Sequence, residues 1–322
     1  GSFSSTAKLE HIGKPVSVPE KMDEFSKLAV EISKMIHDDP IVFDSWVGFD
    51  MSRFDRYFVN SEGSRYFTSD AYFGITVEAY ARADDGTVLP HSLVFYARTP
   101  SQLPKTADLK AAVLQMLVEL KALKSAPELL PVNCPALLEG DTAGVFIHEV
   151  LGHRLEGHRQ SGQEEGATFR GKMGEQIMPD FISLVDDPAM AEFKGQGLNG
   201  YYTHDDEGVA AQFVELIKGG RLVGFLTTRR PTVDSKVSNG HGRSSGIARP
   251  VARMGNLLLK SSKTNTPEEL KKRLMELARE QGKPYGLIVR RAASGVTNTS
   301  SRGFQAFKGL ARLVYKVNAV TG

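Results

Sequence analysis

The chain has 322 residues, of which 41% are hydrophobic and 24% are charged. This composition is typical of a folded globular protein with one large or two medium domains, and it excludes wholesale disorder. The 40 basic residues nearly balance the 38 acidic ones. No basic surplus therefore indicates a nucleic-acid partner or an anionic membrane surface as the target.

The single cysteine, Cys134, cannot form an internal disulfide, which fits a reducing compartment and favours a cytoplasmic protein. No apolar run is long enough to span a membrane. The first residues do not form a signal peptide, and Gly1-Ser2 is typical of an expression tag. A strand-like run at residues 313–317 lies close to the last residue, Gly322, and suggests that the chain is a fragment.

The first part of the chain predicts two amphipathic helices around an antiparallel meander. Apolar residues recur at helical spacing over residues 19–38 and again over residues 107–123. Runs rich in β-branched and aromatic residues, separated by turn signals, predict strands at residues 41–43, 56–59, 72–80 and 92–96.

The second part predicts further strands and one helix. Strands are expected at residues 129–133, 181–185, 254–259, 287–290 and 312–317, with a hairpin of residues 212–217 and 222–227 around Gly219-Gly220. A capping box that starts at Thr266 opens a helix that runs to about residue 281.

Helices and strands do not alternate regularly, and no phosphate-binding glycine motif follows a strand. The sequence therefore predicts an α+β fold with large, mostly antiparallel sheets rather than a doubly wound nucleotide-binding fold. The helix-breaking segment at residues 124–132 places the boundary between an N-terminal α+β portion, residues 1–128, and a second domain, residues 129–322.

The sequence His-Glu-x-x-x-His, formed by His148, Glu149 and His153, is the candidate for chemistry. Zinc binds neutral imidazole nitrogens and keeps an open position for water when it is catalytic. The metal lowers the pKa of that water to about 7 and polarises a carbonyl. A carboxylate beside the metal can take the proton of the water and deliver it to the leaving amine. These residue types favour a zinc peptidase.

The spacing of the two histidines conflicts with a regular helix. Residues five apart lie about 140° apart around an α-helix, so the rings of His148 and His153 would not meet one ion. We therefore expect a bulged or broken turn at residues 150–152, where Gly152 is the residue most able to deform. The spacing alone is equally consistent with a buried apolar helix face that has hydrogen-bonded histidines at its edge.

The wider sequence resembles the TldD/PmbA family of metallopeptidases. The motif continues into Leu155-Glu156-Gly157, and shorter runs of similar sequence follow in the same order over most of residues 40–320. The resembling runs start at Val59, Phe169, Val185, Asp205, Gly219, Leu222, Asn239 and Arg253.

The resemblance implies a metallopeptidase that acts on short or unfolded peptides. It implies one zinc ion held by His148 and His153, Glu149 as general base, and pairing with a second copy or with another family member. The third metal ligand of the family is a downstream cysteine, which this chain lacks, and much of the family's N-terminal region is also missing. The resemblance therefore implies a chain truncated at both ends, or else a different third ligand or no metal.

For four other residues the sequence supports a functional role more weakly. Glu156 can orient His153 or bind the metal, and His158 is expected to be solvated. His204 can contact a metal or the substrate, although a loop or turn role is favoured for it. Arg243 can bind a peptide carboxylate, although loop solvation explains it at least as well. The alternative function is a non-catalytic peptide-binding or partner subunit with an incomplete metal site.

Overall fold

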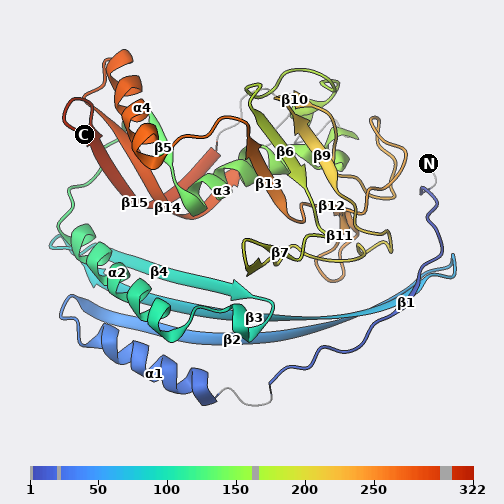
Figure 1. The fold of residues 1–322 in the computed structure, drawn as a ribbon, viewed down its shortest axis with the longest axis horizontal. Helices are drawn as coiled ribbons and strands as arrows, with labels where there is room; N and C mark the ends of the chain where they lie inside the picture. The colour runs from blue at the N-terminus through green and yellow to red at the C-terminus, as the bar shows by residue number, and fades with distance from the viewer. Residues whose placement is uncertain (1–2, 20–22, 162–166, 298–306) are drawn as a thin grey trace. The chain divides into compact units, whose positions relative to one another are not determined.

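The computed structural model describes residues 3–19, 23–161, 167–297 and 307–322, and Figure 1 shows its helices and strands. The protein has an α+β fold and divides into two compact units. The sheet unit comprises Lys8–Leu130 and Ala191–Asn199. The motif unit comprises Gly1–Ala7, Pro131–Met190 and Gly200–Gly322. Each unit thus includes a short segment from the other part of the sequence, which a single boundary after residue 128 does not describe.

The sheet unit is built on the predicted antiparallel meander, which the structure confirms. Its strands are β2 (Val42–Val59), β3 (Arg65–Arg82) and β4 (Val88–Ala97), and the short β1 (Glu10–Ile12) pairs in parallel with the start of β3. The predicted strands at residues 41–43 and 56–59 are the two ends of β2. Most side chains of β2 are exposed or half-buried, so its middle lacks the alternation that marks a strand in the sequence.

The core of the sheet unit lies between one face of β3 and two helices, α1 (Asp23–His37) and α2 (Thr106–Lys124). Alternate residues of β3 from Ala71 to Ala81 are buried, because successive side chains of a strand point to opposite faces. Both helices contribute to this single core and match the helices predicted from apolar spacing. The short strands β7 (Glu192–Phe193) and β8 (Gln196–Gly197) form a separate small hairpin.

The motif unit contains two larger sheets. One has the strand order β10-β9-β6-β13 and is antiparallel throughout, with β6 (Ile182–Asp186), β9 (Val214–Lys218), β10 (Arg221–Leu222) and β13 (Leu257–Ser261). The other has the order β15-β14-β5, in which β14 (Tyr285–Thr297) pairs antiparallel with β15 (Phe307–Asn318) and parallel with β5 (Ala136–Leu138). The helix α4 (Pro267–Glu280) begins at the predicted capping box and packs against β14.

Three predicted strands of the motif unit differ from the observed ones. Residues 129–133 are not a strand, since Pro131 lies in their middle and cannot donate a ladder hydrogen bond. The strand expected at 254–259 starts later, because the backbone N–H of Gly255 donates to Asp186. The second hairpin strand ends at Leu222, after which the chain turns to bridge Glu156 through Leu226. None of the helices in the described ranges is long and apolar enough to cross a membrane.

Candidate metal centre

The histidine motif lies where one helix ends and a tighter helix begins. The helix α3 (Gly140–Val150) carries His148 and Glu149 in its last turn. Leu151 follows with φ of −114° and ψ of −51°, and the 3₁₀-helix η2 (Gly152–Leu155) then carries His153. The predicted break at residues 150–152 is therefore confirmed, as an α-helix that stops and continues as a 3₁₀ turn.

Two contacts explain why the helix changes here. The buried guanidinium of Arg154 donates hydrogen bonds to the backbone carbonyls of Glu149, at 3.2 Å, and of Val150. These are among the carbonyls that a helix end leaves without an internal partner. A Cβ atom on Gly152 would lie 2.1 Å from the sulfur of Met254. A larger residue at position 152 would therefore fit only if the Met254 side chain moved, and the backbone angle at Gly152 is not one that favours glycine.

The change of helix type brings the three motif side chains together. The ring centroids of His148 and His153 are 4.7 Å apart. The Glu149 carboxylate lies 3.9 Å from Nε2 of His148 and 3.8 Å from Nε2 of His153. One donor atom from each residue lies within 4.8 Å of the other two. Donors around one tetrahedral zinc ion, with bonds of about 2.1 Å, are roughly 3.4 Å apart, so small side-chain movements would bring these three atoms to one ion.

A fully buried carboxylate holds His153 in place. Nδ1 of His153 lies 2.9 Å from Oε1 of Glu156, which is 0% exposed. The same carboxylate accepts hydrogen bonds from Nε of Arg159, at 2.7 Å, and from Nη1 of Arg253, at 3.0 Å. Burial acts to raise the pKa of Glu156, but the hydrogen bonds from His153 and Arg159 and the charge of Arg253 outweigh it and lower this pKa below its usual value.

This network fixes which nitrogen of His153 faces the cluster. An ionised Glu156 can only accept hydrogen bonds, so Nδ1 of His153 must carry the hydrogen. Nε2, the nitrogen nearest Glu149, then has a free lone pair when the ring is neutral. Burial and the neighbouring His153 also lower the pKa of His148. Both rings are therefore suited to binding a metal as neutral imidazoles.

The other candidates from the sequence lie outside this cluster. Cys134, whose pKa is raised by burial, does not belong to the group of potential metal ligands found in the described ranges. His204 forms an isolated antiparallel bridge with Ala210, and its Nδ1 lies 3.2 Å from the hydroxyl of Thr203. The Arg243 guanidinium lies 3.2 Å from the Asp206 carboxylate and 4.2 Å from the centre of the Tyr202 ring. The substrate contacts of His204 and Arg243 stay predictions.

Sequence reasoning missed the residues that support the cluster from a distance. Arg154, Arg159 and Arg253 were not singled out as partners of the motif. Arg154 directly follows the motif and Arg159 comes six residues after it, and basic residues near a helix C-terminus are a usable signal. Arg253 is 97 residues away from Glu156 along the chain, so only the fold reveals this contact.

Relatives with similar sequences are named metalloproteases. A metalloprotease of Methanocaldococcus jannaschii is 28% identical over 193 residues, which is 58% of this chain and 38% of the relative. A metalloprotease TldD homolog of Haemophilus influenzae is 37% identical over 149 residues, or 46% of this chain and 29% of the relative. A zinc metalloprotease TldD homolog of Saccharolobus solfataricus is 32% identical over 99 residues, or 30% of this chain and 20% of the relative. The matched regions span well under half the length of these relatives.

Solved structures share the fold at low sequence identity. TldE from Thermococcus kodakarensis has a TM-score of 0.58 and 19% identity, and the match covers 97% of this chain and 71% of that one. A candidate modulator of DNA gyrase from Thermotoga maritima has a TM-score of 0.69 and 18% identity, and covers 99% of this chain and 72% of that one. These likenesses support the α+β architecture described above.

The sequence model of the PmbA/TldA metallopeptidase C-terminal domain matches residues 131–314, which include the whole histidine motif and its buried glutamate. This match covers more than half of the chain. The protein therefore belongs to the TldD/PmbA family of metallopeptidases.

Proposed function

We propose that this chain carries the metal-binding part of a zinc peptidase, with His148 and His153 as metal ligands and Glu149 as general base. The observation that carries the proposal is the His148–Glu149–His153 cluster, in which Glu156 presents Nε2 of His153 to the other two side chains. Two imidazoles and a carboxylate are the donor types that catalytic zinc sites use. The name of the Saccharolobus solfataricus relative supports zinc as the ion.

The chemistry follows from where the carboxylate lies. Zinc bound by the two imidazoles would supply a water of lowered pKa and would polarise the scissile carbonyl. Glu149 is half-buried and adjoins both rings, so it can accept a proton from that water and pass it to the leaving amine. A carboxylate this close can also act as a third ligand, and the experiment below separates the two roles.

The substrate and the partner are further parts of this proposal. Family membership supports short or unfolded peptides as substrates. The likeness to TldE supports pairing with a second copy or with another family member. Cytoplasmic localisation stays a prediction from the lone cysteine.

The decisive experiment measures zinc per chain by elemental analysis and cleavage of a casein-derived peptide mixture by mass spectrometry. Wild type should hold about one zinc per chain. Glu149→Gln should keep the zinc but lose cleavage by about 10²–10⁴-fold. His148→Ala should lose the zinc, and Glu276→Gln, an exposed change on α4, should alter neither property.

Other outcomes have definite meanings. Loss of zinc in Glu149→Gln would make Glu149 a ligand rather than a base. Zinc binding and peptide binding without any cleavage by wild type would favour the non-catalytic peptide-binding role. Absence of zinc from wild type, after loading and buffer exchange, would contradict the proposed metal site.

A further inference from the structure

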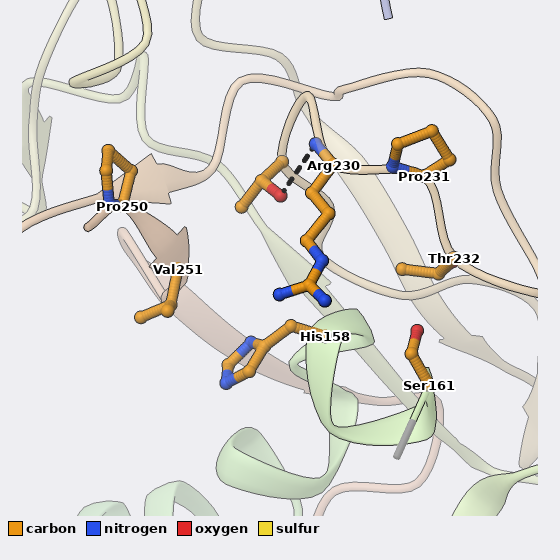
Figure 2. A pocket seen from close by; sticks show the side chains of 8 residues that line it. His158, Ser161, Arg230, Pro231, Thr232, Pro250 and Val251 are labelled. Atoms are coloured by element: carbon orange, nitrogen blue, oxygen red, sulfur yellow. Dashed lines mark hydrogen bonds between the residues drawn. The ribbon is translucent and has the colours of Figure 1, made fainter. Parts of the chain in front are cut away.

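A small pocket lies in the motif unit, and its lining begins two residues after the buried Glu156, at His158. Its volume is about 240 Å³, which is below the range of drug-sized ligand sites and suits a single amino-acid residue. Figure 2 shows the Arg230 side chain extending into the space between His158, Ser161 and Thr232. The described residues that line it are His158, Ser161, Thr228, Arg230, Pro231, Thr232, Pro250 and Val251.

Among the described residues, the lining is cationic and contains no acidic side chain. Arg230 is exposed, and its guanidinium has no hydrogen-bond or ion-pair partner within the described parts of the chain; only its backbone N–H bonds, to Thr228 at 3.2 Å. The other arginines of this region differ, since Arg159 and Arg253 are committed to Glu156. The pocket thus contains a guanidinium that is available for a ligand.

One ring nitrogen of the pocket histidine also lacks a hydrogen-bond partner among the described residues. Nδ1 of His158 is buried and has no hydrogen bond to any described residue. An unpaired buried polar group is unfavourable, and native structures rarely contain one without a functional reason. Burial lowers the pKa of His158 to about 4, so the ring is neutral at neutral pH and can offer one N–H donor. Arg230 then supplies the positive charge of the pocket.

The pocket and the metal cluster are built on the same chain segments. His158 comes two residues after Glu156, the carboxylate that holds His153. Thr228 comes two residues after Leu226, which forms a bridge with Glu156. Val251 lies two residues before Arg253, whose guanidinium bonds to Glu156. A peptide residue in this pocket would therefore be held by the scaffold that orients the proposed zinc ligand.

We propose that this pocket is a subsite for a carboxylate of the peptide substrate, with Arg230 as its charged anchor and His158 as a second donor. The planar guanidinium fork matches a carboxylate through two parallel hydrogen bonds. The proline and valine side chains of the lining supply apolar walls for the rest of the residue. The carboxylate belongs either to the C-terminus of the peptide or to an acidic side chain. This inference rests on the proposed peptidase function, whose substrate it narrows.

The test measures binding without catalysis, so that its result does not depend on turnover. Three dansyl-labelled alanine pentapeptides are titrated against the zinc-free protein in EDTA: a free acid, a C-terminal amide, and an amide with glutamate at the fourth position. The free acid or the glutamate peptide should bind about tenfold more tightly than the plain amide, or 1.4 kcal/mol. Whichever of the two binds more tightly identifies the source of the carboxylate.

Matched variants test whether Arg230 causes the preference for a carboxylate. Arg230→Gln should abolish the tenfold preference, and Arg230→Lys should restore only part of it because an ammonium lacks the fork. Arg273→Gln removes the same charge from an exposed position on α4 and should keep the preference. Equal binding of all three peptides, no binding of any, or a preference that survives Arg230→Gln would overturn the proposal. A preference without cleavage by the zinc-loaded protein would instead count against the peptidase function alone.

Discussion

The two units of the chain have cores of different kinds. The buried residues of the sheet unit are almost all apolar, and among the described residues its buried polar side chains are Ser64, His91 and Glu119. The motif unit has a smaller apolar core and many more buried polar groups, including Thr142, Arg154, Glu156, Gln160, Asp186, Asp205, Thr227, Thr228, Thr232, His241 and Asn256.

The difference follows from the backbone. Long paired strands satisfy the N–H and C=O groups of the sheet unit, so its core can be almost entirely apolar. The loops of the motif unit lack such ladders, and buried side chains bond to their backbone instead. Asp205 accepts from Gly242 N–H, for example, and Asn239 bonds to Phe225 and Thr227. The irregular backbone that forms the site is thus held by side chains.

A histidine–glutamate pair in hydrogen-bond contact occurs among the described residues of each unit, and comparing the two pairs shows what makes a candidate site. His91 and Glu119 lie 2.8 Å apart and are 2% and 7% exposed. His153 and Glu156 lie 2.9 Å apart, but His153 is 20% exposed and its second nitrogen faces Glu149. The pair in the sheet unit belongs to no metal-ligand cluster of the described residues. A histidine–glutamate pair becomes a candidate site only where another donor meets the second nitrogen.

The largest expected effect comes from removing the carboxylate at the centre of the motif unit. Glu156→Gln leaves Arg159 and Arg253 without their counterion, and breaking a buried ion pair costs about 3–5 kcal/mol. We expect the free energy of unfolding, measured by urea denaturation, to fall by about 3 kcal/mol, the lower end of this range. The lower end applies because Arg253 is 44% exposed and keeps some hydration. Zinc affinity should fall about 10–100-fold, since His153 loses the negative charge of the carboxylate that orients it.

The matched control lies in the core of the sheet unit. Ile75 is 0% exposed, and Ile75→Ala should cost about 2–5 kcal/mol while leaving zinc affinity unchanged. Equal losses of zinc affinity in the two variants would show that metal binding tracks general stability rather than the Glu156 contact.

The ionisation of Glu156 should make the free energy of unfolding depend on pH in the acid range. The folded-state pKa of Glu156 is depressed, so its contribution is present above the unfolded-state pKa of about 4.3 and is lost as the pH falls through the folded-state pKa. The stability difference between wild type and Glu156→Gln should therefore shrink as the pH falls below about 4.3. A difference that stays constant down to full protonation would contradict the assigned ionisation of Glu156.

Local sequence signals predicted much of the fold. The capping box at Thr266 and the apolar spacing of α1 and α2 gave helices within a few residues of the observed ends, because these signals act over one or two turns. The local signals failed where the backbone forms hydrogen bonds with residues far along the chain instead of with the adjacent strand. The chain after Leu222 leaves its hairpin because Leu155, Gly157 and Asn239 offer other hydrogen-bond partners.

The candidate site was predictable in its residue types and in its helix break. The five-residue spacing of His148 and His153 requires a distortion, and the observed one begins at Leu151. The sequence could not show what stabilises it. The contact of Gly152 with Met254 joins residues far apart along the chain and depends on the fold of the intervening strands.

A smaller effect is expected from the residue that supports the helix break. Arg154→Met keeps the apolar stem but removes the hydrogen bonds to the carbonyls of Glu149 and Val150. The loss in the free energy of unfolding should be about 1–3 kcal/mol. Zinc affinity, measured with a competing chelator, should fall with it. The control Arg279→Met removes a similar bond to the carbonyl of Ala319 and should leave zinc affinity unchanged. If both variants bind zinc like wild type, Arg154 does not position the motif.

The smallest effect concerns the helix that packs on β14, far along the chain from the motif. Thr266 accepts a hydrogen bond from the backbone N–H of Glu269, and the Glu269 carboxylate accepts one from the backbone N–H of Thr266. Thr266→Ala should reduce the free energy of unfolding by about 1 kcal/mol, whereas Thr266→Ser should be nearly neutral because serine caps equally well. Thermal and urea denaturation of both variants measure this difference. Because α4 supplies no side chain to the metal cluster, zinc content should be the same in both variants, and a drop in Thr266→Ala would mean that the cluster depends on the stability of the whole motif unit.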